Sequence, residues 1–262
     1  MNDYIVELKN IQKKFEDVLI LNDVSLGIKE CETVSICGES GSGKTTLINI
    51  MGLLELPTHG TILWEGQRTI TYGVEKISQL RAKIFGYIFQ RCNLIPELNV
   101  IENILFPKRI TSKISTADIK FAKRLLQRVQ LNGFEERNVL TLSGGESQRI
   151  AVVRAMINHP RIVIADEPTG SLDEKSAIMT MDMIINLCRE YGSSLLLITH
   201  NQLFAKKMQT SYILDSSELG SVLIKMNAKN SAFDIEKTKI EKCDKVATRS
   251  KISLPSSKIG TT

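Results

Sequence analysis

The residues with the clearest chemical signature form one short run: Gly38, Glu39, Ser40, Gly41, Ser42, Gly43, Lys44, Thr45 and Thr46. They fit the pattern G-x-x-x-x-G-K-[ST], in which the backbone N–H groups of a glycine-rich turn surround a chain of phosphates. Lys44 is expected to reach the outer phosphates, and Thr45 to offer its hydroxyl to Mg²⁺. The apolar run at 32–37 predicts a strand before the turn, and apolar residues at helical spacing over 47–54 predict a helix after it. This geometry holds a polyphosphate at a helix N-terminus.

Two carboxylates follow a second apolar segment. Residues 161–165 form a mostly apolar run that is followed by Asp166 and Glu167. Such a run is typical of a parallel strand buried on both faces. The carboxyl end of such a strand lies at the edge of the sheet where ligands bind. Asp166 is therefore the expected Mg²⁺ partner, and Glu167 the expected base.

A second glycine-rich helix start lies in the middle of the chain. Ser143, Gly144, Gly145 and Glu146 precede a predicted helix at 148–155. A serine and two glycines at a helix N-terminus form an anion site by the same physical reasoning as the first run. Two phosphate-binding helix ends in one chain require an explanation.

Three further side chains are ambiguous on their own. Phe15 lies between predicted strands at 4–8 and 18–21 and could stack on a purine face. Gln90 ends a predicted strand at 86–90, and His200 follows another at 194–198, both at the ligand edge of an α/β sheet. Without further context, a core phenylalanine, a solvated glutamine and a structural histidine are the more common interpretations.

Length and composition indicate a globular protein. The chain has 262 residues, 42% of them hydrophobic and 24% charged, enough for one large domain with a subdomain. No apolar run approaches the ~18 residues of a membrane span, and the first residues lack a leader pattern, so a cytoplasmic protein is expected. The five cysteines show no C-x-x-C spacing and are expected to be reduced and mostly structural.

The positive charge is concentrated at the C-terminal end. Residues 221–262 contain nine Lys/Arg and four Asp/Glu, which accounts for the whole net charge of +5 and leaves 1–220 neutral. The folded part therefore has no basic signature, and nucleic acid is not an expected partner. The low hydrophobicity of 221–262 predicts a poorly ordered tail.

The segment 93–158 has a helical pattern. Residues 115–118 resemble a capping box, and apolar residues then recur at helical spacing up to Val129. We expect a helical subdomain that closes at the second glycine-rich start.

Six elements, taken in chain order, resemble the motifs of the ATP-binding subunit of ATP-binding-cassette (ABC) transporters. They are the run 38–46, Gln90, 142–146, 162–167, 171–173 and His200. The resemblance covers roughly residues 1–220, and Leu-Ser-Gly-Gly at 142–145 is its most specific part. Residues 85–104 look like the branch that serves macrolide export, lipoprotein release and antimicrobial-peptide efflux. The chain departs from the family at Glu146, where Gln is more common, and at Thr45, where Ser is more common.

The resemblance implies an α/β fold, a P-loop NTPase cassette with a mixed central sheet, an N-terminal antiparallel β part and a helical subdomain at about 93–158. The expected domains are a cassette at 1–220 and the basic tail at 221–262. Because all six motif elements lie before Gly220, the tail is expected to be dispensable for catalysis.

The family mechanism explains the two phosphate-binding helix ends. Two cassettes stack head to tail, so that the phosphate loop of one and the Ser143 end of the other enclose a single ATP. The resemblance implies Lys44, Gln90, Glu167 and His200 as catalytic residues, and Thr45, Gln90 and Asp166 as Mg²⁺ ligands. The expected contacts to ATP come from Phe15, Gly38, Glu39, Ser40, Gly41, Ser42, Gly43, Lys44, Thr45, Thr46, Ser143, Gly144, Gly145, Glu146 and Asp173.

The implied function is an ATPase subunit that drives a separate multi-span permease in export. It would act as a homodimer at the cytoplasmic face of the membrane, with the helical subdomain gripping a permease helix. The alternative is a soluble ABC-type ATPase without a membrane partner, for example of the cluster-assembly type. DNA-repair members carry a long coiled coil between the motifs, but only 52 residues separate Gln90 from Ser143 here.

Overall fold

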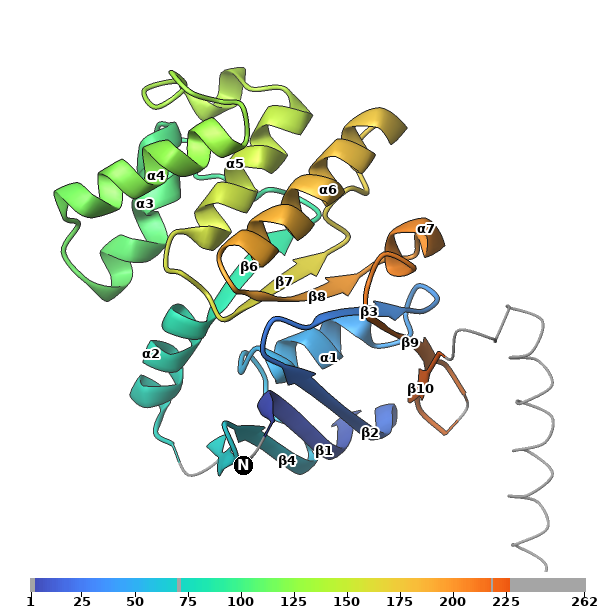
Figure 1. Ribbon diagram of the computed structural model, residues 1–262. Helices are drawn as coiled ribbons and strands as arrows, with labels where there is room; N and C mark the ends of the chain where they lie inside the picture. The colour runs from blue at the N-terminus through green and yellow to red at the C-terminus, as the bar shows by residue number, and fades with distance from the viewer. Residues whose placement is uncertain (1–2, 70–71, 218, 227–262) are drawn as a thin grey trace, which may run out of the picture. The chain divides into compact units, whose positions relative to one another are not determined.

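The computed structural model describes residues 3–69, 72–217 and 219–226 (Figure 1). One compact unit extends to Lys225, and residues 227–262 of the expected tail lie outside the described residues. The strands are β1 (Tyr4–Phe15), β2 (Val18–Lys29), β3 (Thr33–Cys37), β4 (His59–Trp64), β5 (Gln67–Arg68), β6 (Phe85–Phe89), β7 (Ile162–Asp166), β8 (Ser194–Ile198), β9 (Thr210–Asp215) and β10 (Val222–Lys225). The helices are α1 (Lys44–Met51), α2 (Val74–Ile84), α3 (Val100–Thr111), α4 (Thr116–Arg128), the 3₁₀ turn η2 (Val139–Thr141), α5 (Gly144–Met156), α6 (Glu174–Glu190) and α7 (Gln202–Ala205).

An antiparallel sheet with the strand order β2-β1-β4-β5 forms the N-terminal part. Strands β1 and β2 are 12 residues long and pair down to Phe15 and Val18, so a two-residue turn joins them. The sequence analysis predicted only 4–8 and 18–21. The rest of β1 is mostly exposed or half-buried, whereas in β2 the buried residues Val24, Leu26 and Ile28 alternate with more exposed ones, a strand pattern that the analysis missed.

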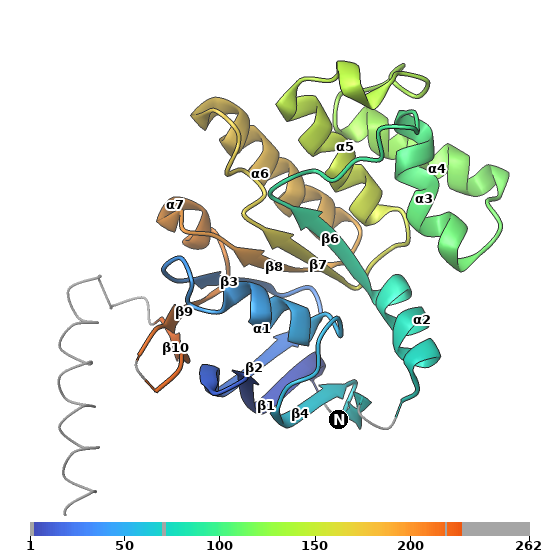
Figure 2. The ribbon, with the colours of Figure 1, turned by 180° about the vertical axis from the view of Figure 1, so that it is seen from behind.

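The central sheet has the order β10-β9-β3-β8-β7-β6. All neighbours are parallel except β10 and β9, so the sheet is mixed as expected. Along β7, Val163 and Ala165 face a core shared with α3 to α6, whereas Ile162 and Ile164 face a second core shared with α1 and the antiparallel sheet. This alternation explains the continuous apolar run, because a strand covered on both faces has no polar side. Figure 2 shows the two layers from behind.

The helical subdomain contains α3, α4 and α5, and each helix begins with a reciprocal capping box. The box at Ser115 and Asp118 is the one that the sequence predicted, and it is present. The sequence analysis missed helix α2, because only Ile84 among its residues is buried and it has no broad apolar face. The fold class expected from the resemblance, with its mixed sheet, antiparallel β part and helical subdomain, is confirmed.

The expected cassette boundary at residue 220 falls one strand short. Strand β10 pairs with β9 through four residues, from Val222 opposite Asp215 to Lys225 opposite Tyr212. Just before it, the Ser221 N–H donates to the Ile20 carbonyl, and the Asn22 N–H donates to the Ser221 carbonyl. The compact unit therefore includes residues 221–225, which the sequence analysis assigned to the tail.

A chain cut after Gly220 is expected to be less stable than one cut after Met226, because it loses β10 and both hydrogen bonds of Ser221. Losing a few kcal/mol from a domain of this size lowers the thermal midpoint by about 5 °C or more. Thermal unfolding of the two truncated proteins measures the difference. Equal midpoints would show that β10 contributes nothing to the stability of the cassette.

Candidate functional site

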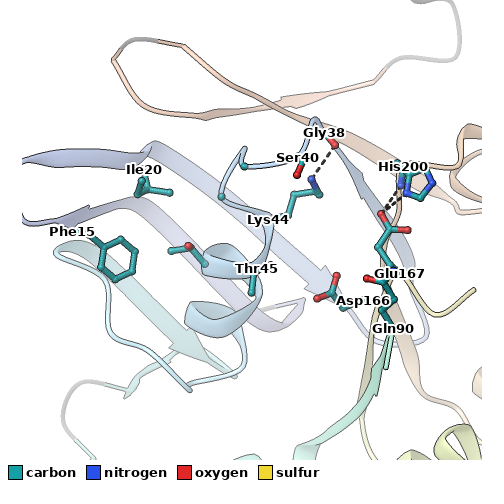
Figure 3. A pocket seen from close by; sticks show the side chains of 13 residues that line it. Phe15, Ile20, Gly38, Ser40, Lys44, Thr45, Gln90, Asp166, Glu167 and His200 are labelled. Carbon is teal, nitrogen blue, oxygen red and sulfur yellow. Dashed lines mark hydrogen bonds and ion pairs between the residues drawn. The ribbon is translucent and has the colours of Figure 1, made fainter. Parts of the chain in front are cut away.

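A cavity of about 590 Å³ lies at the carboxyl ends of the central strands. Figure 3 shows Phe15 and Ile20 at one end, Asp166, Glu167 and His200 at the other, and Lys44 and Thr45 between them. Its lining brings together residues from six separate segments of the chain: Phe15, Ile20, Gly38, Ser40, Gly41, Gly43, Lys44, Thr45, Thr46, Gln90, Asp166, Glu167 and His200.

The phosphate loop leaves the start of α1 open to a ligand. Gly43 is the N-cap with φ of 85°, a left-handed conformation that favours glycine, and no side chain caps the helix. A Cβ at this position would lie 2.8 Å from Cγ2 of Ile20, so glycine is also required by the close approach of β2. No acidic residue occupies the first turn, and the free N–H groups and helix dipole can therefore bind an anion.

Lys44 holds the loop in its present shape. Its Nζ donates to the carbonyl oxygens of Gly38 at 3.0 Å and Glu39 at 2.6 Å, and it lies 3.4 Å from Oγ of Ser42. The Lys44 ammonium group thus lies inside the loop and lines the cavity, where it could bind phosphates.

The two carboxylates at the end of β7 have different environments. Burial raises the pKa of the Asp166 carboxyl and the neighbouring Glu167 raises it further, while Lys44 lowers it. Glu167 has φ of 45°, a strained conformation for a residue with a side chain, and its N–H donates to the Ile198 carbonyl at 2.9 Å. This turn points the Glu167 side chain along the cavity edge toward the end of β8 (Figure 3).

His200 and Glu167 form a direct pair. The Oε1 atom of Glu167 accepts from the backbone N–H of His200 at 2.8 Å and lies 2.9 Å from its Nδ1. The Thr199 hydroxyl donates to Oε2 at 3.3 Å. Glu167 is largely buried with 16% of its side chain exposed, whereas the His200 ring is 76% exposed and free to meet a ligand.

Phe15 and Gln90 lie at opposite ends of the cavity. The ring of Phe15 is 47% exposed, and the Lys13 ammonium lies 4.9 Å from its centroid, so the ring is available for stacking on a base. Gln90 is exposed at the end of β6 and packs against the turn that follows Glu167, where a Cβ on Gly170 would lie 2.9 Å from its Nε2.

Several expected ATP contacts lie outside this cavity: Glu39, Ser42, Ser143, Gly144, Gly145, Glu146 and Asp173. Ser42 is buried beneath the loop. The N–H and hydroxyl of Ser143 both donate to Oε2 of Glu146 at 2.7 Å, and Asp173 caps α6 by accepting from the Ser176 N–H at 3.0 Å. One chain therefore contains the phosphate loop and the Ser143 end of α5 as separate surfaces.

The sequence analysis missed two residues of the site. Ile20 lines the cavity because β2 passes over the phosphate loop, and Thr199 binds Glu167 because β8 ends beside β7. Both positions depend on how distant strands are arranged, and no local pattern marks them.

Comparisons with known proteins agree with this site. The family model described as "ABC transporter" matches residues 21–170. The lipoprotein-releasing system ATP-binding protein LolD of Francisella tularensis subsp. tularensis (strain FSC 198) is 38% identical over 85% of this chain and 99% of its own. LolD of Porphyromonas gingivalis (strain ATCC BAA-308 / W83) is 39% identical over 77% of this chain and 92% of its own.

Two solved structures of one cassette, MJ0796, have the same fold. Its dimeric structure is 33% identical with a TM-score of 0.74, over 85% of this chain and 99% of that one. A dimeric post-hydrolysis state bound to ADP and Pi is 34% identical with the same TM-score and coverage. The matched family, the relatives and the cavity together show that this chain belongs to the ABC transporter family, as one of its ATP-binding subunits.

Proposed function

We propose that the chain is the ATP-hydrolysing subunit of an ABC exporter, which dimerises around ATP and drives a separate membrane permease. The observation that carries the proposal is the separation of the two phosphate-binding helix ends. The cavity contains the phosphate loop, Glu167 and His200, whereas the Ser143 end of α5 lies outside it. A second copy stacked head to tail supplies that missing end, and the related MJ0796 cassette is a dimer.

The residues of the cavity have distinct roles in hydrolysis. Phe15 and Ile20 hold the base, and the loop N–H groups with Lys44 bind the phosphates. Glu167 orients the attacking water and accepts its proton, while His200 contacts the γ-phosphate and keeps Glu167 in place through the 2.9 Å contact. Lys44 and His200 stabilise the charge that develops as the phosphoryl group is transferred. Ser143 and Gly145 of the partner subunit close the site over the γ-phosphate.

The donor set also fits a Mg²⁺ ion. Asp166, Thr45 and Gln90 line the same cavity and offer the oxygen ligands that Mg²⁺ prefers, alongside substrate phosphates. When bound, the ion neutralises charge on the β- and γ-phosphates.

A second, apolar groove of about 560 Å³ fits the permease. It runs between α2, α3 and β6, and its lining combines apolar side chains with Arg81 and Arg154. Four of the apolar side chains, Leu54, Phe89, Phe106 and Ile110, are exposed, and the others are buried or half-buried: Phe85, Tyr87, Ile95 and Pro107. Exposed apolar grooves of this kind receive an amphipathic helix. We expect a short permease helix here. Asn93 and Ile95 belong to the lining, and we propose that residues 93–100 contribute to this contact.

The location follows from the partner. Among the described residues, no helix is long and apolar enough to cross a bilayer. Because the proposed partner is a membrane protein, we place the cassette at the cytoplasmic face, attached through the permease, which also selects the cargo. The relatives named for lipoprotein release support the export branch over a cluster-assembly ATPase.

Replacing Glu167 by Gln is expected to lower ATP hydrolysis by roughly 10²–10⁴-fold, because an amide keeps the shape but cannot accept the proton. ATP binding should persist, and uncleaved ATP should hold two subunits together. Size exclusion with and without saturating ATP then shows an ATP-dependent dimer.

The matched control adds Ser143→Arg to Glu167→Gln. Bulk and charge at the closing face should abolish the dimer while the phosphate loop of each monomer still binds ATP. A Glu167→Gln protein that hydrolyses ATP at the parental rate, or stays monomeric at saturating ATP, contradicts the two-cassette site.

Replacing Asp166 by Asn should stabilise the nucleotide-free protein. The pKa of Asp166 is raised in the folded protein, so the free energy of unfolding decreases as the pH rises through that pKa. Ionised Asp166 therefore destabilises the nucleotide-free fold at neutral pH. We expect the thermal midpoint of Asp166→Asn to be higher by roughly 2 °C at neutral pH, with the difference shrinking toward about pH 4. In the same assay, Mg²⁺ should no longer increase the stabilisation by ATP. A lower midpoint at neutral pH, or an intact Mg²⁺ effect, argues against this role.

Replacing Ile110 by Asp should weaken association with the permease, because it places a charge in the apolar groove. The side chain is 70% exposed, so folding and nucleotide affinity should be unchanged. Affinity purification from solubilised membranes should recover a multi-span protein with the parental chain and several-fold less with the variant. Ile119→Asp on α4, outside the groove and also exposed, is the matched control. Equal recovery with Ile110→Asp and Ile119→Asp would show that the permease binds elsewhere.

A further inference from the structure

Two side chains of α5 hold the segment that contains Gln90. Gln148 has no exposed surface, and its amide makes two hydrogen bonds to this segment. Its Nε2 donates to the Phe89 carbonyl at 3.3 Å, and its Oε1 accepts from the Cys92 thiol at 2.9 Å. Gln90 and Arg91 are the two residues between these attachment points, so Gln148 holds the segment on both sides of Gln90.

Arg154 holds the same segment from further along α5. Its Nη1 donates to the Asn93 carbonyl at 2.7 Å and its Nη2 to the Cys92 carbonyl at 2.5 Å. Arg154 and Asn93 also line the apolar groove. The segment after Gln90 is thus attached to α5 at Cys92 and Asn93, and Arg154 connects it to the groove.

Helix α5 connects these contacts to the other ATP site. It begins at Gly144, directly after Ser143, and Gln148 lies about one turn later. The buried face of the helix includes Ile150 and Val153, both without exposed surface, so this part of α5 is closely packed in the core. One end of α5 thus faces the ATP of the partner subunit, and its first turns contact the segment that meets the ATP of its own subunit.

We propose that Gln148 is a positioning residue that couples the two ATP sites of the dimer. The inference rests on the head-to-tail arrangement in the proposed function. When ATP draws Gln90 toward its phosphate, the segment from Phe89 to Cys92 moves, Gln148 transfers this displacement to α5, and Ser143 is moved toward the second ATP.

The chemistry of Gln148 fits a coupling role better than a packing role. A leucine or methionine would fill the same buried space without the need to satisfy polar atoms, whereas an amide offers one donor and one acceptor and can hold two points at once. A thiol is a weak donor, so the bond to Cys92 can exchange as the segment moves while Arg154 keeps the segment attached. Burial also raises the pKa of the Cys92 thiol, which keeps its proton available.

The decisive measurement is the ATP dependence of hydrolysis by the full-length protein and its Gln148→Met variant, which has similar volume but makes neither hydrogen bond. Two coupled sites give a Hill coefficient approaching 2. We expect the parental protein to be near this value and Gln148→Met to be near 1. The affinity of isolated monomers for ATP, measured in the Ser143→Arg background, should agree within about twofold between the two proteins.

Cys92 provides a second pair of variants that leaves Gln148 in place. Cys92→Ala removes the donor to Oε1 and should lower the Hill coefficient, whereas Cys92→Ser restores a donor and should recover it. A purely structural role would instead lower the thermal midpoint and leave the Hill coefficient unchanged. This pair keeps the proposal testable if Gln148→Met does not fold.

The outcomes separate this inference from the proposed function. If Glu167→Gln forms the ATP-dependent dimer but the parental Hill coefficient is 1, or Gln148→Met and Cys92→Ala keep the parental value, coupling through Gln148 is wrong and the dimer stands. If no ATP-dependent dimer forms, both the proposed function and this inference are wrong.

Discussion

The unpaired N-terminus of α1 is the constraint on which the rest of the site depends. Every α-helix begins with N–H groups that lack an intrahelical partner. Helices α3, α4 and α5 satisfy some of theirs with a side-chain cap and a carboxylate in the first turn, whereas α1 has Gly43 as its N-cap and no acidic residue. An anion from outside the chain is therefore the natural partner of α1, and the surrounding elements are arranged around the space that this anion fills.

The charges around that space are poorly balanced without a ligand. Asp166 and Glu167 lie next to each other at the end of a buried strand, and burial and their mutual repulsion raise the pKa of Asp166. Lys44 is the neighbouring cation, and its ammonium group donates hydrogen bonds to the carbonyl oxygens of the loop. The strained backbone of Glu167 is retained because its carboxylate is fixed by Thr199 and His200. Such strain and charge are typical of sites that are completed by substrate, whose binding then stabilises the fold.

The parts of the structure that the sequence predicted are those with a local cause. The glycines of the run 38–46, the doubly covered strand before Asp166 and the capping box at Ser115 all leave a pattern within a few residues. Helix α2 and strand β10 leave none, because α2 buries little and β10 is defined by its pairing with β9. Ile20 and Gln148 were missed for the same reason, since their contacts come from segments more than 20 and 50 residues away.

The N-termini of α1 and α5 differ in a way that predicts which of them binds ATP first. The open end of α1 is available in a single chain, whereas the end of α5 is partly satisfied internally, because the Glu146 N–H donates to Oγ of Ser143 and the Ser143 N–H donates to the Glu146 carboxylate. Glu146 also brings a negative charge to that end, and the hydrogen bonds from Ser143 and the nearby Arg149 and Arg137 lower its pKa, so it stays ionised. A phosphate approaching α5 must compete with this carboxylate, while the N-terminus of α1 has no side-chain cap and no acidic residue in its first turn. ATP is therefore expected to bind first to the phosphate loop of its own subunit, and the Ser143 end joins only when the dimer closes.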